Sequence, residues 1–273
     1  MIGRAPAMLL LVLAAAESGR FYFEYTFVAG PADIAQHLVI RDQSATVVHE
    51  PGFPSAEGDT IGIFRAPVSR AQQEQLAKLM PDRLPAMDVR PDSPSFSFHL
   101  QFERRNVSLV VPNNPAASTQ VASLVAAINE LTATAMKNPY RALAFEVLPP
   151  APLAAGKTGV IRVRLRDAGS QPVRLELSDA VLRIESTPPP PPPDPNLMPR
   201  PVVWSRVDIA PWREPAVQIE PHGAKDVAVR VKFSSPGVFL VRAWFARPAN
   251  QDPENPEIGG AALSTTARIT VSP

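Results

Sequence analysis

The side chains best suited to catalysis or metal binding are few in this chain of 273 residues, which has four histidines and no cysteine. No two of the histidines share the i, i+4 spacing of a helix or the i, i+2 spacing of a strand, so the sequence predicts no metal-binding cluster. The lack of cysteine also excludes thiol catalysis and disulfide exchange. We expect solvated or hydrogen-bonded roles for all four histidines: His37, His49, His99 and His222.

One short segment, AAGKT at 154–158, matches the end of the phosphate-binding loop motif. A phosphate-binding loop would need a glycine where this chain has Ala151 and a helix after the lysine, whereas the sequence continues here as a strand. No GxSxG motif is present either. We therefore expect no cofactor and no enzymatic activity, with a catalytic site assembled from distant residues as the alternative.

Two groups of charged residues could bind ions or anionic surfaces. The loop NQDPENPEIGG offers Asp252, Glu254 and Glu257 as calcium ligands, but it lacks the EF-hand spacing, so we expect a hydrated loop. Arg162, Arg164 and Arg166 alternate along one strand and could contact an anionic surface. We favour their neutralisation by acidic residues on neighbouring strands, and candidates for that role are Glu176 and Glu185.

The overall charge argues against nucleic-acid binding. The chain carries 27 basic and 26 acidic side chains, a net charge of +1, and they are spread over both halves. Neither half has the one-sided positive field that displaces counterions from phosphates.

The N-terminus has the pattern of a secretory signal peptide. Arg4 precedes an apolar run at 8–16, and Ala14 and Ala16 match the small residues of a cleavage site. The run is too short for the roughly 20 residues that cross a bilayer. We expect a signal peptide at 1–16 and export to a bacterial periplasm or the extracellular space, with no transmembrane span in the mature chain.

Residues 17–143 combine strand and helix patterns. The segments FYFEYTFV at 21–28 and SFSFHLQF at 95–102 alternate with aromatic residues on one face, as half-buried strands do. A capping box of Ser69 and Gln72 opens a predicted helix at 69–80, and a second helical pattern follows Asn114. We expect an α+β domain in which an antiparallel sheet carries two helices on one face.

Residues 144–273 show about eight or nine strand patterns and no helix. The segments PLAAGKTGVIRVRLRDAGSQPVRLEL and SSPGVFLVRAWFA resemble strand pairs of bacterial immunoglobulin-like domains. The resemblance implies an all-β, immunoglobulin-like antiparallel sandwich. The order of strands and helices in the first half is similar to that of the emfourins, which are small metalloprotease inhibitors.

A proline-rich segment at 187–201 contains six consecutive prolines from Pro188. It lies between two strand patterns of the sandwich, so we interpret it as a stiff loop of that domain held extended by polyproline geometry. The alternative is a PxxP ligand for the aromatic groove of a partner.

These observations favour an exported, non-catalytic protein that binds another macromolecule or an envelope surface. The alternatives are a protease inhibitor acting through the α+β domain and a hydrolase using scattered carboxylates. Aromatic and proline side chains lose little rotamer entropy on binding, which makes them good contact residues, although both tryptophans could instead fill the sandwich core. The candidate partner-binding residues are Pro190, Pro193, Trp204 and Trp212.

Overall fold

The computed structural model describes residues 20–30, 33–51, 56–84, 94–190, 202–248 and 257–273. The predicted signal peptide and the candidate residues Pro193, Asp252 and Glu254 lie outside these ranges. The chain forms two compact units. Among the described residues, unit 1 lies within 20–49 and 64–138, and unit 2 lies within 50–63 and 139–273.

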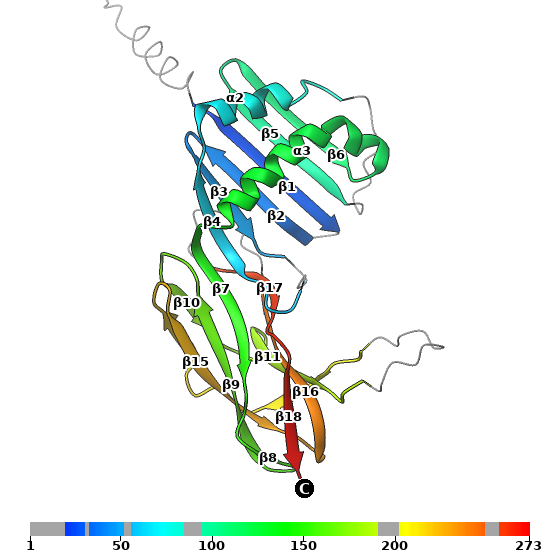
Figure 1. The fold of residues 1–273 in the computed structure, drawn as a ribbon, viewed down its shortest axis with the longest axis vertical. Coiled ribbons are helices and arrows are strands. Elements are labelled where there is room, and N and C mark those ends of the chain that lie inside the picture. Colours follow the sequence, from blue (N-terminus) through cyan, green and yellow to red (C-terminus); the bar gives the residue numbers. More distant parts are fainter. Residues whose placement is uncertain (1–19, 31–32, 52–55, 85–93, 191–201, 249–256) are drawn as a thin grey trace, which may run out of the picture. The chain divides into compact units, whose positions relative to one another are not determined.

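Unit 1 is an antiparallel sheet with two helices. The strands follow the order β4-β3-β2-β1-β5-β6, and β1 pairs with both β2 and β5. Helix α3 contacts α2, β3 and β6, and both helices lie against this sheet (Figure 1). The elements are β1 (Tyr22–Gly30), β2 (Asp33–Arg41), β3 (Ser44–His49), β4 (Ile61–Pro67), α2 (Arg70–Leu79), β5 (Ser95–Phe102), β6 (Arg105–Pro112) and α3 (Pro115–Ala135).

Sequence patterns explain the elements of unit 1 well. The two aromatic strands are confirmed as β1 and β5, and their phenylalanines Phe23 and Phe98 are fully buried. The capping box is also confirmed, because the Ser69 side chain accepts a hydrogen bond from the Gln72 main chain and the Gln72 side chain accepts one from the Ser69 main chain. Each interaction satisfies a donor that the first turn of α2 would otherwise leave free.

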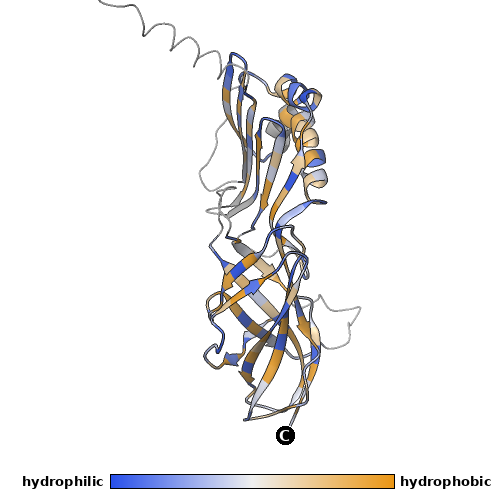
Figure 2. Ribbon diagram, turned by 90° about the vertical axis from the view of Figure 1, so that its left-hand side faces the viewer, coloured by the Kyte–Doolittle hydropathy of each residue, from blue (hydrophilic) through white to orange (hydrophobic). Residues whose placement is uncertain are grey.

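Unit 2 consists of strands around one hydrophobic core, and most but not all of these strands pair in the antiparallel sense. One group of strands has the order β13-β15-β9-β7, a second pairs β10 with β14, and a third has the order β12-β11-β16-β18-β8, with β17 also beside β16. Hydrophobic and hydrophilic residues alternate along these strands (Figure 2). The elements are β7 (Pro139–Leu148), β8 (Leu153–Ala154), β9 (Thr158–Asp167), β10 (Val173–Glu176), β11 (Leu182–Thr187), β12 (Ser205–Arg206), β13 (Asp208–Ile209), β14 (Ala216–Ile219), β15 (Ala224–Lys232), β16 (Gly237–Arg247), β17 (Gly260–Leu263) and β18 (Ala267–Ser272).

The predicted fold class, an α+β domain followed by an immunoglobulin-like sandwich, is wrong. Strands make up 54% of the described residues, which contain two helices, so this part of the protein is predominantly β with large antiparallel sheets. The chain forms three more strands between β1 and helix α2, namely β2, β3 and β4, and they enlarge the β content of the first half. The coarser expectation stands, since mostly antiparallel strands are compatible with a β-sandwich.

The segment 50–63 comes from the N-terminal half of the sequence but belongs to unit 2. The buried carboxylate of Glu50 accepts a hydrogen bond from the Gly259 main chain at 2.8 Å. Glu57 accepts two more from Thr266, one from the hydroxyl at 2.7 Å and one from the main chain at 3.1 Å. Each contact spans 209 residues of sequence, so no local pattern could predict it.

Neither α2 nor α3, the helices of the described residues, combines the length and the hydropathy that a membrane-spanning helix needs.

Candidate functional site

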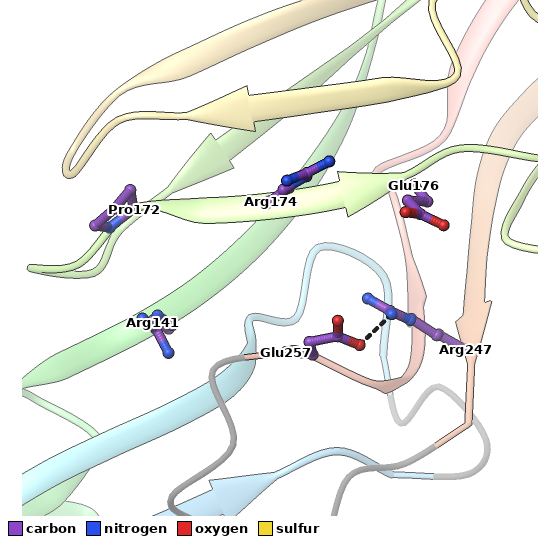
Figure 3. Close-up of a pocket in the computed structure, with 6 residues that line it drawn as sticks. All are labelled: Arg141, Pro172, Arg174, Glu176, Arg247 and Glu257. Atoms are coloured by element: carbon purple, nitrogen blue, oxygen red, sulfur yellow. Dashed lines mark hydrogen bonds and ion pairs between the residues drawn. The ribbon is translucent and has the colours of Figure 1, made fainter.

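Unit 2 contains a polar hollow of about 360 Å³ beside strand β10 (Figure 3). Arg174 and Glu176 project from β10, while Arg141 comes from β7 and Arg247 from the end of β16. Glu257, which we predicted in a hydrated acidic loop, lies across the hollow and forms an ion pair with Arg247. The remaining lining residue is Pro172.

A second site is an alternating stack of tryptophan and arginine side chains, which we name the Trp–Arg stack: Trp204, Arg242, Trp244 and Arg183. The Arg242 Cζ lies 4.0 Å from the Trp204 ring centroid and 5.8 Å from that of Trp244. The Arg183 Cζ lies 4.4 Å from the Trp244 ring centroid. A guanidinium within about 6 Å of an aromatic face is attracted by the quadrupole of the ring.

Strand register brings most of the stack together. In the antiparallel pair β11–β16, Arg183 lies opposite Trp244 and Glu185 lies opposite Arg242. Because side chains alternate between the faces of a sheet, these four residues share one face. The intervening residues of β11 and β16 lie in the hydrophobic core: Leu182, Ile184, Val241, Ala243 and Phe245.

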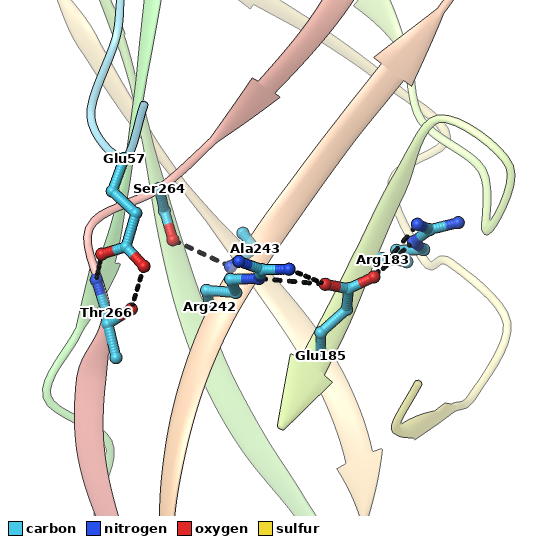
Figure 4. Close-up of polar contacts among 7 residues, drawn as sticks. All are labelled: Glu57, Arg183, Glu185, Arg242, Ala243, Ser264 and Thr266. Carbon is cyan, nitrogen blue, oxygen red and sulfur yellow. Dashed lines mark hydrogen bonds and ion pairs between the residues drawn. The ribbon is translucent and has the colours of Figure 1, made fainter. Parts of the chain in front are cut away.

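The carboxylate of Glu185 fixes both arginines of the stack (Figure 4). Its Oε2 accepts from Nε and Nη2 of Arg242 at 3.0 and 2.8 Å, and its Oε1 lies 3.1 and 3.0 Å from Nε and Nη2 of Arg183. The side chains of Glu185 and Arg242 are only 9% and 13% exposed. Bidentate, charge-assisted contacts in such a place hold the guanidinium planes in fixed orientations.

The buried side-chain hydroxyl of Ser264 supports β16 at Ala243, between the stack residues Arg242 and Trp244. The Oγ of Ser264 accepts a hydrogen bond from the Ala243 main chain at 2.8 Å and donates one to the Thr265 carbonyl at 2.9 Å. Ser264 lies between β17 and β18 in the sequence, and both of these strands pair with β16. Figure 4 shows Ser264 and the Glu57–Thr266 contact together with Arg183, Glu185 and Arg242.

The surroundings of the stack are apolar and basic. Val202 and Val203 precede Trp204, and Val203 is 74% exposed. The three prolines that follow β11, at 188–190, are exposed as well. Arg206 lies opposite Glu185 in the β11–β12 pair and is exposed. The surface therefore joins aromatic, apolar and cationic groups.

The predicted contact residues have different environments in the structure. Trp204 belongs to the Trp–Arg stack and Pro190 is exposed beyond the end of β11. Trp212 packs against the hydrophobic core of unit 2, and its Nε1 is buried without a hydrogen-bond partner among the described residues. Sequence reasoning missed Arg183, Arg242 and Trp244, and it assigned Glu185 to the arginines of β9 instead. The available signal was the placement of charged residues inside the apolar segments VLRIES and GVFLVRAWF.

The arginines of β9 have other partners than those we predicted. Arg164 forms two hydrogen bonds with Asp226 on β15, at 2.8 and 3.0 Å, and Arg166 lies 3.8 Å from Glu146 on β7. The hydrogen bond with Arg164 lowers the pKa of Asp226 and raises that of Arg164. The predicted partners Glu176 and Glu185 instead belong to the polar hollow and the Trp–Arg stack.

Two of the four histidines lie in a polar network on the sheet of unit 1. The His37 Nε2 is 2.9 Å from the Glu24 Oε1, and the Tyr22 hydroxyl donates to the Glu24 Oε2 at 2.7 Å. The His99 ring stacks edge-on against Tyr22, with 5.6 Å between centroids, and hydrogen-bonds Ser108 at 2.7 Å. Burial and the bond to Glu24 raise the pKa of Tyr22 to about 12. Burial raises the pKa of Glu24, but the bonds from Tyr22 and His37 outweigh it and lower the pKa overall.

The lowered pKa of Glu24 predicts a loss of stability in acid. The ionised carboxylate stabilises the fold above its ordinary pKa, and this contribution disappears as the pH falls through the lowered pKa of the folded state. We expect Glu24→Gln to flatten the acid limb of a plot of urea midpoint against pH, measured by circular dichroism from pH 3 to 6. Glu130→Gln, which changes an exposed residue of α3, is the control and should keep the wild-type slope. An unchanged slope in the Glu24 variant would remove this role.

Neither protein-family models nor curated protein sequences match this chain.

Proposed function

We propose that this chain is an exported, non-catalytic protein that binds another protein through the surface around the Trp–Arg stack. The observation that carries the proposal is the fixed alternation of two tryptophan rings with two guanidinium groups on a partly exposed face. Tryptophan and arginine are the residues most enriched among those that dominate the energy of protein interfaces.

The rigidity of the stack favours binding. A flexible arginine loses side-chain entropy when a partner orders it, at a cost of about 0.5–1.5 kcal/mol for each side chain. Here Glu185 already orders both arginines, and the contacts of Arg242 with the rings of Trp204 and Trp244 restrict it further. The exposed Val203 adds apolar surface at the margin. A partner surface with carboxylates and apolar side chains would complement this face, because it presents more cationic than anionic groups.

The same contacts argue for binding rather than for chemistry at this face. A general acid or base needs a carboxylate oxygen with room for a substrate proton. Both oxygens of Glu185 are instead occupied by guanidinium groups on either side. The hydrogen bonds that hold the stack therefore occupy both oxygens of the Glu185 carboxylate, which is the group that a general acid or base would need.

A quantitative pull-down tests this proposal. The full chain, tagged after Pro273, would be expressed in the bacterium that produces it and recovered from the envelope and the culture fluid. N-terminal sequencing of the recovered chain checks the export step, with cleavage expected after Ala16. We expect a discrete partner, and we expect Trp204→Ala to weaken its binding roughly 30-fold, as an interface residue worth about 2 kcal/mol would.

Two further variants interpret the pull-down. Trp204→Phe keeps an aromatic face over Arg242 and should retain most of the binding. Arg162→Ala removes an exposed arginine of β9, away from the stack, and should bind as the wild type does. A partner that binds all of these variants equally would contradict the assignment of this face, and so would the absence of any partner at micromolar concentrations.

A further inference from the structure

Three arginines and two glutamates line the polar hollow beside β10, so the lining itself has a net positive charge. Arg247 pairs with Glu257. The Arg174 side chain makes no ion pair or hydrogen bond with the described residues. The Arg141 Cζ lies 5.5 Å from the Tyr140 ring centroid, and its charge also interacts with the carboxylate of Asp167. The Nε of Arg141 is also buried without a hydrogen-bond partner among those residues. A buried donor without a partner is costly, so a bound acceptor would satisfy a group that the fold leaves open.

The edge of β10 that faces this hollow has main-chain groups without a hydrogen-bond partner among the described residues. The Leu177 N–H donates to the Pro215 carbonyl just before β14, and β14 is the strand that pairs with β10 among the described residues. In an antiparallel pair, successive residues direct their main-chain groups to opposite sides. The N–H and C=O groups of Arg174 and Glu176 therefore point away from β14, toward the unpaired edge.

The hollow continues along the strand as a groove. A second depression of about 350 Å³ shares Glu176 and Arg247 with the first. It extends over Leu177 and Ser178 toward Pro215. From Pro172 to Ser178 the groove follows six steps from one residue to the next, which at about 3.3 Å for each step is roughly 20 Å. That length fits about six residues of an extended peptide better than it fits a single small ion.

We propose that this groove binds an extended peptide that adds to the free edge of β10 and presents a carboxylate to Arg141 and Arg174. Strand addition supplies affinity through main-chain hydrogen bonds, and the side chains along the groove supply selectivity. The two arginines select an acidic residue because a guanidinium binds a carboxylate through charge-assisted, often bidentate contacts. Glu176, farther along the groove, disfavours a second acidic residue at the neighbouring position. The groove is separate from the Trp–Arg stack, so this inference does not depend on the proposed function.

Titration of the isotope-labelled full chain with designed peptides tests the inference by NMR. The first probe is a blocked six-residue peptide of alternating valine and threonine with one central aspartate, and the second has asparagine in its place. We expect the aspartate peptide to shift the Nε–Hε resonances of Arg141 and Arg174 and the amide resonances of Arg174 and Glu176. The asparagine peptide should bind at least 10-fold more weakly.

Variants separate the groove from other surfaces. Arg174→Met should abolish the preference for aspartate, and because Arg174 is exposed its substitution should leave the fold intact, as an unchanged spectrum elsewhere would show. Arg162→Met makes the same change on β9 and should bind like the wild type. Trp204→Ala should also leave peptide binding unchanged, which distinguishes this site from the Trp–Arg stack. Equal affinity for both peptides, shifts outside the groove, or shifts with acetate but with neither peptide would each overturn the proposal.

Discussion

Replacing Gly62 by alanine is expected to destabilise unit 2 by about 3 kcal/mol or more, because the new side chain combines backbone strain with a clash against main-chain atoms. Gly62 has a φ of +137°, a conformation that residues with a Cβ rarely adopt. A Cβ there would overlap the Arg141 carbonyl oxygen and lie 3.0 Å from the Ala142 Cα. Main-chain atoms of a paired strand cannot move aside as the end of a flexible side chain can.

Urea unfolding followed by tryptophan fluorescence measures this effect directly, because all three tryptophans lie in unit 2. The control is Gly156→Ala. Gly156 has a φ of +73°, but a Cβ on it would meet no atom within 4 Å. It should therefore show only the conformational cost of about 1–2 kcal/mol. Equal losses in the two variants would mean that the close approach of Gly62 to Arg141 is not a constraint on the fold.

Replacing Glu185 by alanine is expected to cost about 3 kcal/mol of stability, because it leaves the guanidinium of Arg242 largely buried without its carboxylate. Arg183 contributes less to this loss, since its side chain is 35% exposed and water can solvate its charge. We also expect the stack to lose its order, so that the Trp204 side chain becomes more accessible and a soluble quencher reduces its fluorescence more strongly. Glu185→Gln, which keeps the shape and loses the charge, should fall between the wild type and the alanine variant.

The matched control for Glu185 is Asp226→Ala. Asp226 also forms a two-point contact with an arginine of a neighbouring strand, but on an exposed surface. Exposed ion pairs contribute little because water and salt screen them. We therefore expect no measurable change in its urea midpoint. If the Glu185 variant were as stable as this control, the carboxylate would not organise the stack.

Local sequence signals located many of the elements. The alternation in 21–28 and in 95–102 predicts β1 and β5, and the Ser69–Gln72 capping box marks the start of α2. These signals depend only on residues that are close in the sequence, so they predict local elements correctly whatever the arrangement of the sheets. The fold class was wrong because it depends on how strands are distributed among sheets. The pairing of β10 with β14 away from the other strands has no local signature.

The candidate sites likewise contain some residues that the sequence could predict and others that it could not. Trp204 could be chosen from the sequence because a tryptophan beside a proline-rich segment is a plausible contact residue. Its companions could not, because the positions of Arg183 and Trp244 opposite each other follow from the register of β11 and β16. The partner of Glu185 is Arg242, 57 residues away, rather than an arginine of β9. Register depends on the whole core, which a single sequence does not specify.

Site-specific photo-crosslinking in the producing cells tests the central proposal most directly. A photoreactive amino acid in place of Val203, beside the Trp–Arg stack, should give one discrete adduct with a partner protein in the envelope or culture fluid. The same residue in place of Val160, an exposed position on β9 of the same unit, should not give that adduct. No adduct from position 203, or the same adduct in equal yield from both positions, would contradict the proposal that this face binds a partner.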